Sequence, residues 1–315
     1  GLAGVLGPDG APTGAGDGIE TLTVLLGANN ALKTVIELKV EWSRDGEFAD
    51  LEAKDAFTVW RPDHFRAELA ELVAQLKEVR ARHVILGTVP HVTIAPIARG
   101  VDRKVAPGSR YFPFYTRPWI RDQDFDPARD PHITAAEARA IDSAIDHYND
   151  AITEAVRQAR REGRDWYLLD VAGLLDRLAA RRYQLDPSAR PEWWEPYPLP
   201  PALAALDPVP DSRFFVSGAA GRMQGGLFSL DGVHPTTILY GLMAQEFMNV
   251  MQLAGVEFAY PTGTVRPGPV EVDFERLKRL DTLISDPPRS LSADLRLLGW
   301  FDERFDAFRR MFARG

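Results

Sequence analysis

The sequence predicts an α/β protein built on a parallel β-sheet. Three short apolar, β-rich runs at residues 21–26, 83–90 and 166–171 are separated by segments whose apolar residues recur at helical spacing. The first run shows no alternation of apolar and polar residues, which is typical of a strand buried on both faces. Strands that alternate with helices in this order form a parallel sheet with right-handed crossovers.

Composition indicates a globular protein that acts on small molecules. The 315 residues are 45% hydrophobic and 26% charged, and no apolar run approaches the ~20 residues of a membrane span. The net charge is −8 with acidic and basic residues interspersed, so no basic stripe favours nucleic acid. The absence of cysteine excludes disulfides, thiolate metal sites and a cysteine nucleophile. The length fits two domains, or one α/β domain with insertions.

The first half of the chain contains one clear helix and one long insertion. Residues 1–18 hold seven glycines, which predicts a flexible start. Residues 62–82 carry apolar side chains at helical spacing and predict a helix between the first two strands. The insertion at 94–131 is rich in proline and aromatic residues. It is either a lid or acyl-pocket wall, or a loop anchored by aromatic packing.

The second half continues the alternation of helices and strands. Thr134 and Glu137 have the spacing of a capping box, which starts a helix that ends near residue 163. A short helix follows the third strand, with Asp170 as its expected cap. Residues 186–212 form a second cover loop, and 214–216 are expected to extend a sheet edge. After the helix that ends at residue 254, apolar spacing predicts two tail helices, over 274–283 and 295–308.

Polar residues that directly follow the strands are the first candidates for a site. Ligands of open α/β sheets bind outside the carboxyl ends of the strands. Asn29 follows the first strand, and Gly27 lets the backbone turn sharply enough to aim its amide at a developing oxyanion. Alternatively, Asn29 caps the next segment. His91 follows the second strand, but a lone histidine is more often structural, and it is not included among the candidates.

A second candidate is the loop that leads into the last long helix of the domain. Asp231 precedes His234 by three residues, and a carboxylate at this spacing can fix the tautomer of an imidazole and stabilise its protonated form. Pro235 suits the first turn of a helix, and Thr236 or Thr237 can cap it. The alternative is an ordinary surface turn that happens to contain a histidine.

Together these residues resemble the SGNH, or GDSL-type, ester hydrolases. Gly27-Ala28-Asn29 matches the family's third block, G-x-N-D, and Asp231-Gly232-Val233-His234 matches the fifth, D-x-x-H. The resemblance covers residues 19–255 and implies a three-layer, Rossmann-like (flavodoxin-like) fold, with 256–315 as a helical extension packed on it. It also implies hydrolysis of a small-molecule ester through an acyl-enzyme, without metal or cofactor. His234 would be the general base, Asp231 its orienting partner, and Asn29 with Gly27 part of the oxyanion hole.

Two departures from the family pattern matter. Asn30 stands where the family has aspartate, and none of the 26 residues before Gly27 is serine. The family's nucleophilic serine precedes the third block by several tens of residues, so it is expected upstream of Gly1, and the domain would be incomplete at its amino end. A circular permutation that supplies Ser285 or Ser290 is a remote alternative.

Two other classes of protein remain as alternatives. A non-catalytic module of the same fold would use the pocket to bind an acyl or glycan ligand. A metal-dependent hydrolase would need a cluster of histidines and carboxylates, which the sequence does not show.

Overall fold

A three-stranded parallel sheet lies at the centre of the molecule. The structure is a computed structural model that describes residues 18–50 and 52–289. The sheet has the order β1-β2-β6, with β1 at Ile19–Val24, β2 at Ala81–Gly87 and β6 at Trp166–Leu169. Val24 of β1 is paired with Leu86 of β2, which in turn is paired with Leu168 of β6. The three strands expected from the sequence are thereby confirmed, and the chain is an α/β protein. The expectation that the first strand is buried on both faces is wrong, because β1 lies at the edge of the described sheet and none of its residues is fully buried.

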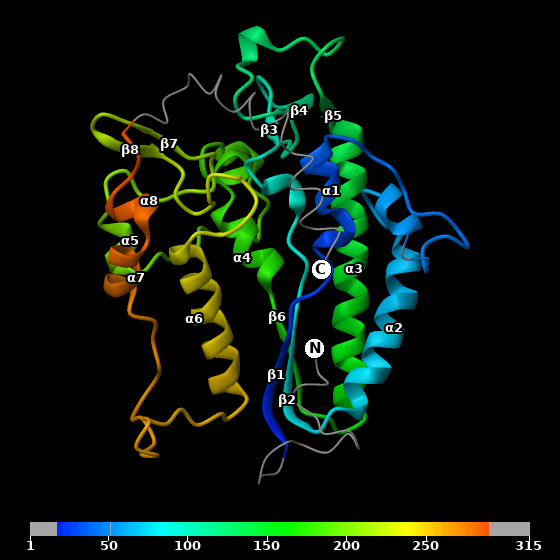
Figure 1. The fold of residues 1–315 in the computed structure, drawn as a ribbon, viewed down its shortest axis with the longest axis vertical. Coiled ribbons are helices and arrows are strands. Elements are labelled where there is room, and N and C mark those ends of the chain that lie inside the picture. Colours follow the sequence, from blue (N-terminus) through cyan, green and yellow to red (C-terminus); the bar gives the residue numbers. More distant parts are fainter. Residues whose placement is uncertain (1–17, 51, 290–315) are drawn as a thin grey trace.

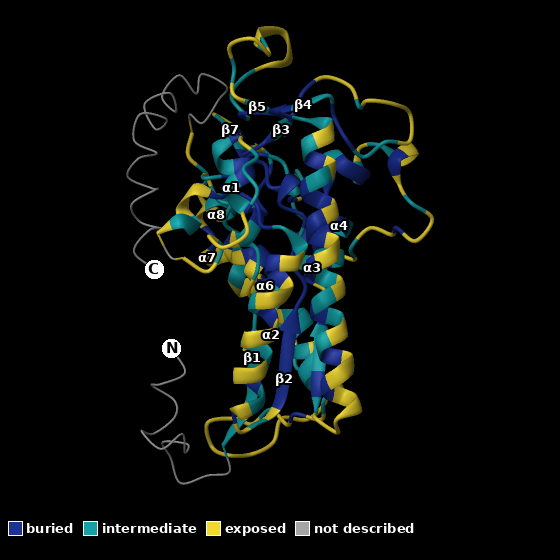
Figure 2. Cartoon of the chain, turned by 90° about the vertical axis from the view of Figure 1, so that its right-hand side faces the viewer, coloured by how far each residue is buried: buried dark blue, intermediate teal, exposed yellow. Residues whose placement is uncertain are grey.

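Helices cover both faces of this sheet (Figure 1). Helices α2 (Pro62–Glu78) and α3 (Ala135–Arg161) lie on one face, and α6 (Thr237–Leu253) lies on the other. Figure 2 shows β2 buried between its neighbours, as its apolar sequence predicts. On the α6 side, Ile85 and Leu169 pack against Met243 and Phe247 of that helix.

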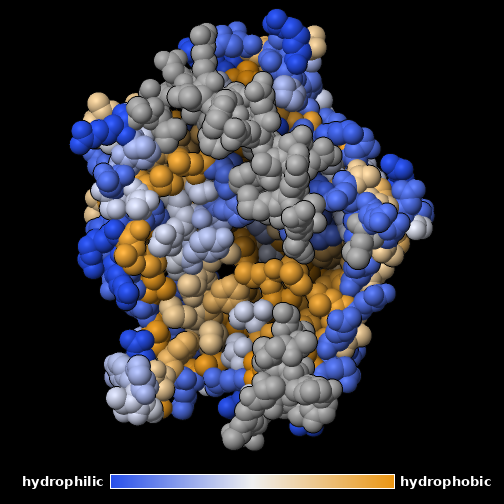
Figure 3. All heavy atoms as spheres, viewed as in Figure 1, coloured by the Kyte–Doolittle hydropathy of each residue, from blue (hydrophilic) through white to orange (hydrophobic). Residues whose placement is uncertain are grey.

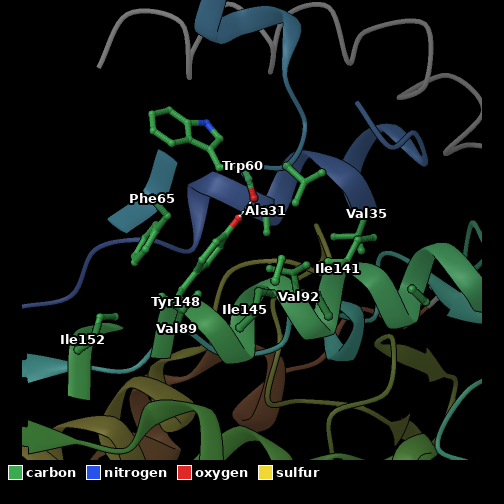
Figure 4. Packing of buried hydrophobic residues seen from close by; sticks show 14 of the residues in the cluster. Ala31, Val35, Trp60, Phe65, Val89, Val92, Ile141, Ile145, Tyr148 and Ile152 are labelled. Atoms are coloured by element: carbon green, nitrogen blue, oxygen red, sulfur yellow. Dashed lines mark hydrogen bonds between the residues drawn. The ribbon is translucent and has the colours of Figure 1, made fainter. Parts of the chain in front are cut away.

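The main core lies between the sheet and helices α2 and α3. Tyr148 of α3 stacks on Phe65 of α2, with ring centroids 4.1 Å apart, and its hydroxyl donates to the carbonyl of Trp60 (Figure 4). Helix α1 (Asn29–Glu37) adds Ala31 and Val35 to the same cluster. These contacts fix the segment that follows β1 against the sheet.

The shorter elements connect or cover this framework. They are the helices α4 (Val171–Leu178), α5 (Pro201–Ala204), α7 (Phe274–Leu280) and α8 (Thr282–Ser285), and the strands β3 (Arg99–Gly100), β4 (Phe114–Thr116), β5 (His132–Thr134), β7 (Val216–Gly218) and β8 (Gly221–Gln224). Residues 180–184 form a single π-helical turn after α4.

Local signals placed two helix starts correctly. Thr134 and Glu137 form the predicted capping box, in which the Thr134 hydroxyl accepts from the Glu137 amide and the Glu137 carboxylate accepts from the Thr134 amide. The Asp170 carboxylate caps α4 by accepting from the Gly173 amide at 2.9 Å. By contrast, α2 ends at Glu78 rather than near 82, because the carbonyl of Arg80 already accepts from the Ile19 amide at the edge of the sheet.

Small sheets that the sequence did not predict lie in or close to the two long loops at 94–131 and 186–212. Strands β3, β4 and β5 form an antiparallel sheet within and just after the insertion 94–131. The expectation that 214–216 extend a sheet edge is wrong for Phe214 and Phe215, which lie outside any strand. Val216 pairs with Gln224 in the separate β7-β8 hairpin, because the glycine-flanked turn at 218–221 folds the chain back on itself.

The first tail helix packs against α6. The predicted segment 274–283 forms α7 and α8, which are separated at Asp281. Gly241 of α6 lets α7 approach closely, since a Cβ at this position would lie 2.4 Å from a methyl carbon of Leu277. The predicted flexible start and the helix at 295–308 fall on residues 1–17 and 290–315, outside the described residues. Within the described ranges, no helix combines the length and apolar character needed to cross a membrane.

Candidate functional site

Asp231 and His234 form a hydrogen-bonded pair in the loop before α6. The Asp231 Oδ2 lies 2.6 Å from the His234 Nδ1. The other carboxylate oxygen, Oδ1, accepts from the backbone amides of Val233 at 2.8 Å and His234 at 2.9 Å, and from the Ser229 hydroxyl at 2.6 Å. The short spacing that suggested the pair therefore produces a fixed carboxylate–imidazole contact.

The loop that carries this pair is held by its own backbone. The Ser229 amide donates to the His234 carbonyl at 2.8 Å, and Phe228 forms a bridge with Pro235. Gly232 adopts φ +68, and its carbonyl accepts from the Ile97 amide at 3.0 Å. A Cβ on Gly232 would come within 2.8 Å of the Ile97 nitrogen, so only glycine fits this turn without displacement.

The Asp231 carboxylate is held in its ionised form and orients the imidazole. Burial of the Asp231 carboxyl tends to raise its pKa, but hydrogen bonds from Ser229, His234 and the backbone outweigh burial and hold the pKa below its usual value. An ionised carboxylate next to Nδ1 keeps the proton on that nitrogen and stabilises the imidazolium form. The His234 side chain is 44% exposed. The Asp231 carboxylate therefore fixes the orientation of the ring, and part of the ring remains accessible to solvent.

The start of α6 differs from the expected cap. The helix begins at Thr237, so Pro235 lies before the cap position, and Thr236 occupies that position without capping. Its hydroxyl instead donates to the carbonyls of Gly226 and Leu227, which ties the loop to the chain upstream. The Ile238 amide donates to the carboxylate of Asp281, at 3.1 Å, so a residue of the tail replaces the local cap.

Gly27 and Asn29 lie at the carboxyl end of β1. Gly27 has φ +118, and a Cβ there would meet Val89 at 2.6 Å, so glycine is required by both conformation and space. Asn29 is the first residue of α1 and is exposed, with Ala28 at the cap position. Its side-chain amide has no hydrogen-bond partner among the described residues, so it does not act as the local cap. An apolar pocket of about 350 Å³ opens beside Gly27 and is lined by residues such as Leu26 and Phe65.

Both halves of the predicted site are anchored to the main core. Val233, between Asp231 and His234, packs on the cluster that contains Ala31 and Val35 of α1. The structure joins Asp231 and His234 directly and holds the loop that carries them against the core that also anchors α1.

His91 belongs to a buried charge network. Its Nε2 faces Asp146 Oδ1 at 3.0 Å and its Nδ1 faces Asp176 Oδ2 at 3.2 Å. Arg182 bridges Asp142 at 2.8 Å and Asp176 at 3.2 Å. Burial lowers the pKa of His91, but attraction to Asp142 and hydrogen bonds to Asp146 and Asp176 prevail and raise it to about 9. His91 is thus an imidazolium that binds its neighbours rather than a free base.

A serine–histidine–aspartate chain also occurs elsewhere. The Ser43 hydroxyl lies 2.8 Å from His64 Nδ1, and His64 Nε2 lies 2.9 Å from Asp45. A nucleophile must be reachable and its carboxylate protected. Here Ser43 is 2% exposed and also accepts from the Arg61 amide, while the Asp45 side chain is 80% exposed. A catalytic triad has an accessible serine and a protected carboxylate, and here the serine is buried and the carboxylate exposed. The Ser43–His64–Asp45 hydrogen bonds therefore hold the loop at residues 43–45 against the start of α2.

The same region contains a group of possible metal ligands. Asp45, Asp63 and His64 lie close together, but the guanidinium of Arg61 bridges Asp45 at 3.0 Å and Asp63 at 2.8 Å. A cation of the protein itself therefore already occupies the space between the two carboxylates.

One site residue escaped the sequence-based reasoning. Ser229 is not among the residues that the sequence singled out, yet its hydroxyl donates to Asp231 and positions it. Since the hydroxyl proton is directed to that carboxylate, Ser229 serves as a positioning residue in this loop. The sequence signal that could have indicated this role is the position of Ser229, two residues before Asp231.

Comparisons with known proteins give no relative. The chain matches no known protein family, no curated protein and no solved structure at a significant level.

Proposed function

We propose that the protein is a serine ester hydrolase of the GDSL type. His234 would act as general base and acid, Asp231 would orient it, and Asn29 with Gly27 would donate to the oxyanion. The observation that carries the proposal is the Asp231–His234 contact at 2.6 Å, with an ionised carboxylate behind a half-exposed imidazole. In acyl transfer such a base takes the proton of a serine hydroxyl and later returns it to the leaving alcohol.

The finer fold and the nucleophile are part of the same proposal. In the described part of the chain β1 is an edge strand, with β2 as its partner. Figure 3 shows apolar residues gathered in the middle of the face where Figure 1 places β1, and Leu25 and Leu26 beyond its end are 42% and 59% exposed. We place the nucleophilic serine on a strand beside this edge, in a segment that precedes Gly1, which would complete a Rossmann-like three-layer domain. The pocket beside Gly27 offers room for an apolar acyl group.

The proposal is tested with the protein as its gene encodes it. A fluorophosphonate probe should label one serine, and p-nitrophenyl acetate should be hydrolysed, because the probe and the substrate both require an activated hydroxyl. The chain of residues 1–315 should neither react nor turn over. Labelling of Ser43 or Ser229 would show that the nucleophile has been misplaced.

Variants of the pair give the mechanistic test. His234→Ala and Asp231→Asn should each lower kcat by roughly 10³-fold or more, and the double variant should be little worse than His234→Ala, because triad members act as a unit. His147→Ala is the matched control, since His147 is an exposed histidine of α3 that lies 3.7 Å from Asp150. Asn29→Ala should cost roughly 10²–10³-fold in kcat. Equal losses at His147 and His234 would contradict the assignment.

The alternative, a binding module without catalysis, gives a different result. The encoded protein would then show no probe labelling and no turnover, while it retained binding of an acyl or glycan ligand.

A further inference from the structure

A large cavity beside the candidate loop is lined by positive charge. It has a volume of about 870 Å³ and lies between residues 93–121, most of which belong to the insertion 94–131, and residues 179–224. Eight arginine and lysine side chains line it, against one carboxylate, that of Asp186. The volume is within the usual range of pockets for small organic ligands, roughly 300–1,000 Å³. The protein as a whole carries −8, so this concentration of cations is local.

Most of these cations are paired with carboxylates. Arg182 is paired with Asp142 and Asp176, and Arg99 with Asp122. Two further pairs lie at the rim: Lys104 with Asp186 at 2.8 Å, and Arg213 with Asp211 at 2.7 Å. These pairs fix the wall in place.

Arg181 is different. Among the described residues no carboxylate lies within ion-pair distance of it, and its Nε is buried without a hydrogen-bond partner. The guanidinium lies over the Phe112 ring, 5.0 Å from the centroid, and donates to the Gly100 carbonyl at 2.8 Å. Burial lowers the pKa of Arg181, and repulsion from Arg99 adds to this.

Two successive arginines of the π-helical turn have different partners. Both line the cavity, but Arg182 is paired with Asp142 and Asp176, whereas Arg181 is repelled by the charges of Arg99 and Arg213 and is attracted by the more distant Asp122. Single π-turns occur often at functional sites. A partly buried cation without a counter-ion is costly to the fold, and an anion in the cavity would remove that cost.

We propose that this cavity binds an organic anion carrying phosphate or carboxylate groups, with Arg181 as its main charge partner. A guanidinium suits both groups, because its fork of N–H donors matches their paired oxygens. The remaining wall includes Phe112, Trp119 and Phe214, which suit a carbon skeleton. Phe214 also lies 3.1 Å from the position of a Cβ on Gly232, so the ligand would sit next to the Asp231–His234 loop. Binding does not depend on catalysis by His234.

Titration calorimetry of the full chain at low ionic strength tests the proposal. The probes are pyrophosphate, citrate and fructose 1,6-bisphosphate, with fructose as the uncharged control. At least one anion should bind at one site, with an affinity that falls as salt is added, and fructose should not bind. Pyrophosphate and citrate distinguish phosphate from carboxylate as the recognised group. Absence of binding by all three anions would refute the proposal.

Variants locate the binding site. Arg181→Met replaces the guanidinium over Phe112 by an uncharged, apolar group and should weaken binding at least tenfold, whereas Arg157→Met, at an exposed arginine of α3, should not change it. His234→Ala should bind as the parent does, which separates this inference from the proposed hydrolase. Arg181→Met should also keep or raise the Tm, because it removes an uncompensated charge. A lowered Tm with unchanged binding would show that Arg181 is structural.

Discussion

The charge network around His91 leads to a prediction about stability at alkaline pH. The ring nitrogens face Asp146 and Asp176, with Asp142 and Arg182 in the same cluster, and the pKa of His91 is about 9 in the folded protein. The ordinary pKa of histidine is about 6.5. Because the folded value is the higher one, His91 contributes stability that is fully present below pH ~6.5 and is lost as the pH rises through about 9.

The size of the effect follows from the two pKa values. They differ by about 2.5 pH units, and each unit corresponds to ~1.4 kcal/mol, so the loss between pH 6 and pH 10 is ~3 kcal/mol. A domain has a total stability of only ~5–15 kcal/mol, so a loss of this size is measurable.

Urea unfolding at a series of pH values measures this loss. His91→Gln keeps a polar side chain of similar reach but cannot carry the charge. The free energy of unfolding of the parent, minus that of the variant, should fall by ~3 kcal/mol from pH 6 to pH 10. The subtraction removes the contributions of groups that titrate in both proteins. A difference that stays constant over this range, or rises with pH, would refute the charged state of His91.

Two further substitutions test the loop and the start of α6. Gly232→Ala should destabilise the protein by at least ~1 kcal/mol more than Gly255→Ala. Both residues have positive φ, but only at Gly232 would the Cβ clash with the Ile97 backbone. Equal losses of stability in thermal unfolding would mean that the loop can shift to accommodate the Cβ. Asp281→Ala should cost ~1–2 kcal/mol in urea unfolding, since the Ile238 amide loses its acceptor, whereas Asp281→Asn should cost less; similar losses would exclude the capping role.

The sequence determined the features whose partners lie within a few residues. Period and β-rich composition placed the three strands, and hydrogen-bonding side chains at fixed offsets placed the starts of α3 and α4. The Asp231–His234 contact belongs to the same class, because three residues of chain leave little freedom between the two groups. The spacing of residues along the sequence was therefore sufficient to predict the Asp231–His234 pair of the candidate site.

Tertiary structure decided the features that join distant segments. The charge of His91 depends on Asp142, Asp146 and Asp176, which α3 and α4 bring to it from 51 to 85 residues away. The cap of α6 came from Asp281 rather than from the neighbouring threonines. In each case the stabilising interaction joins residues that are far apart in the sequence. The sequence pattern does not reveal the path of the chain between them or the direction of the side chains that interact.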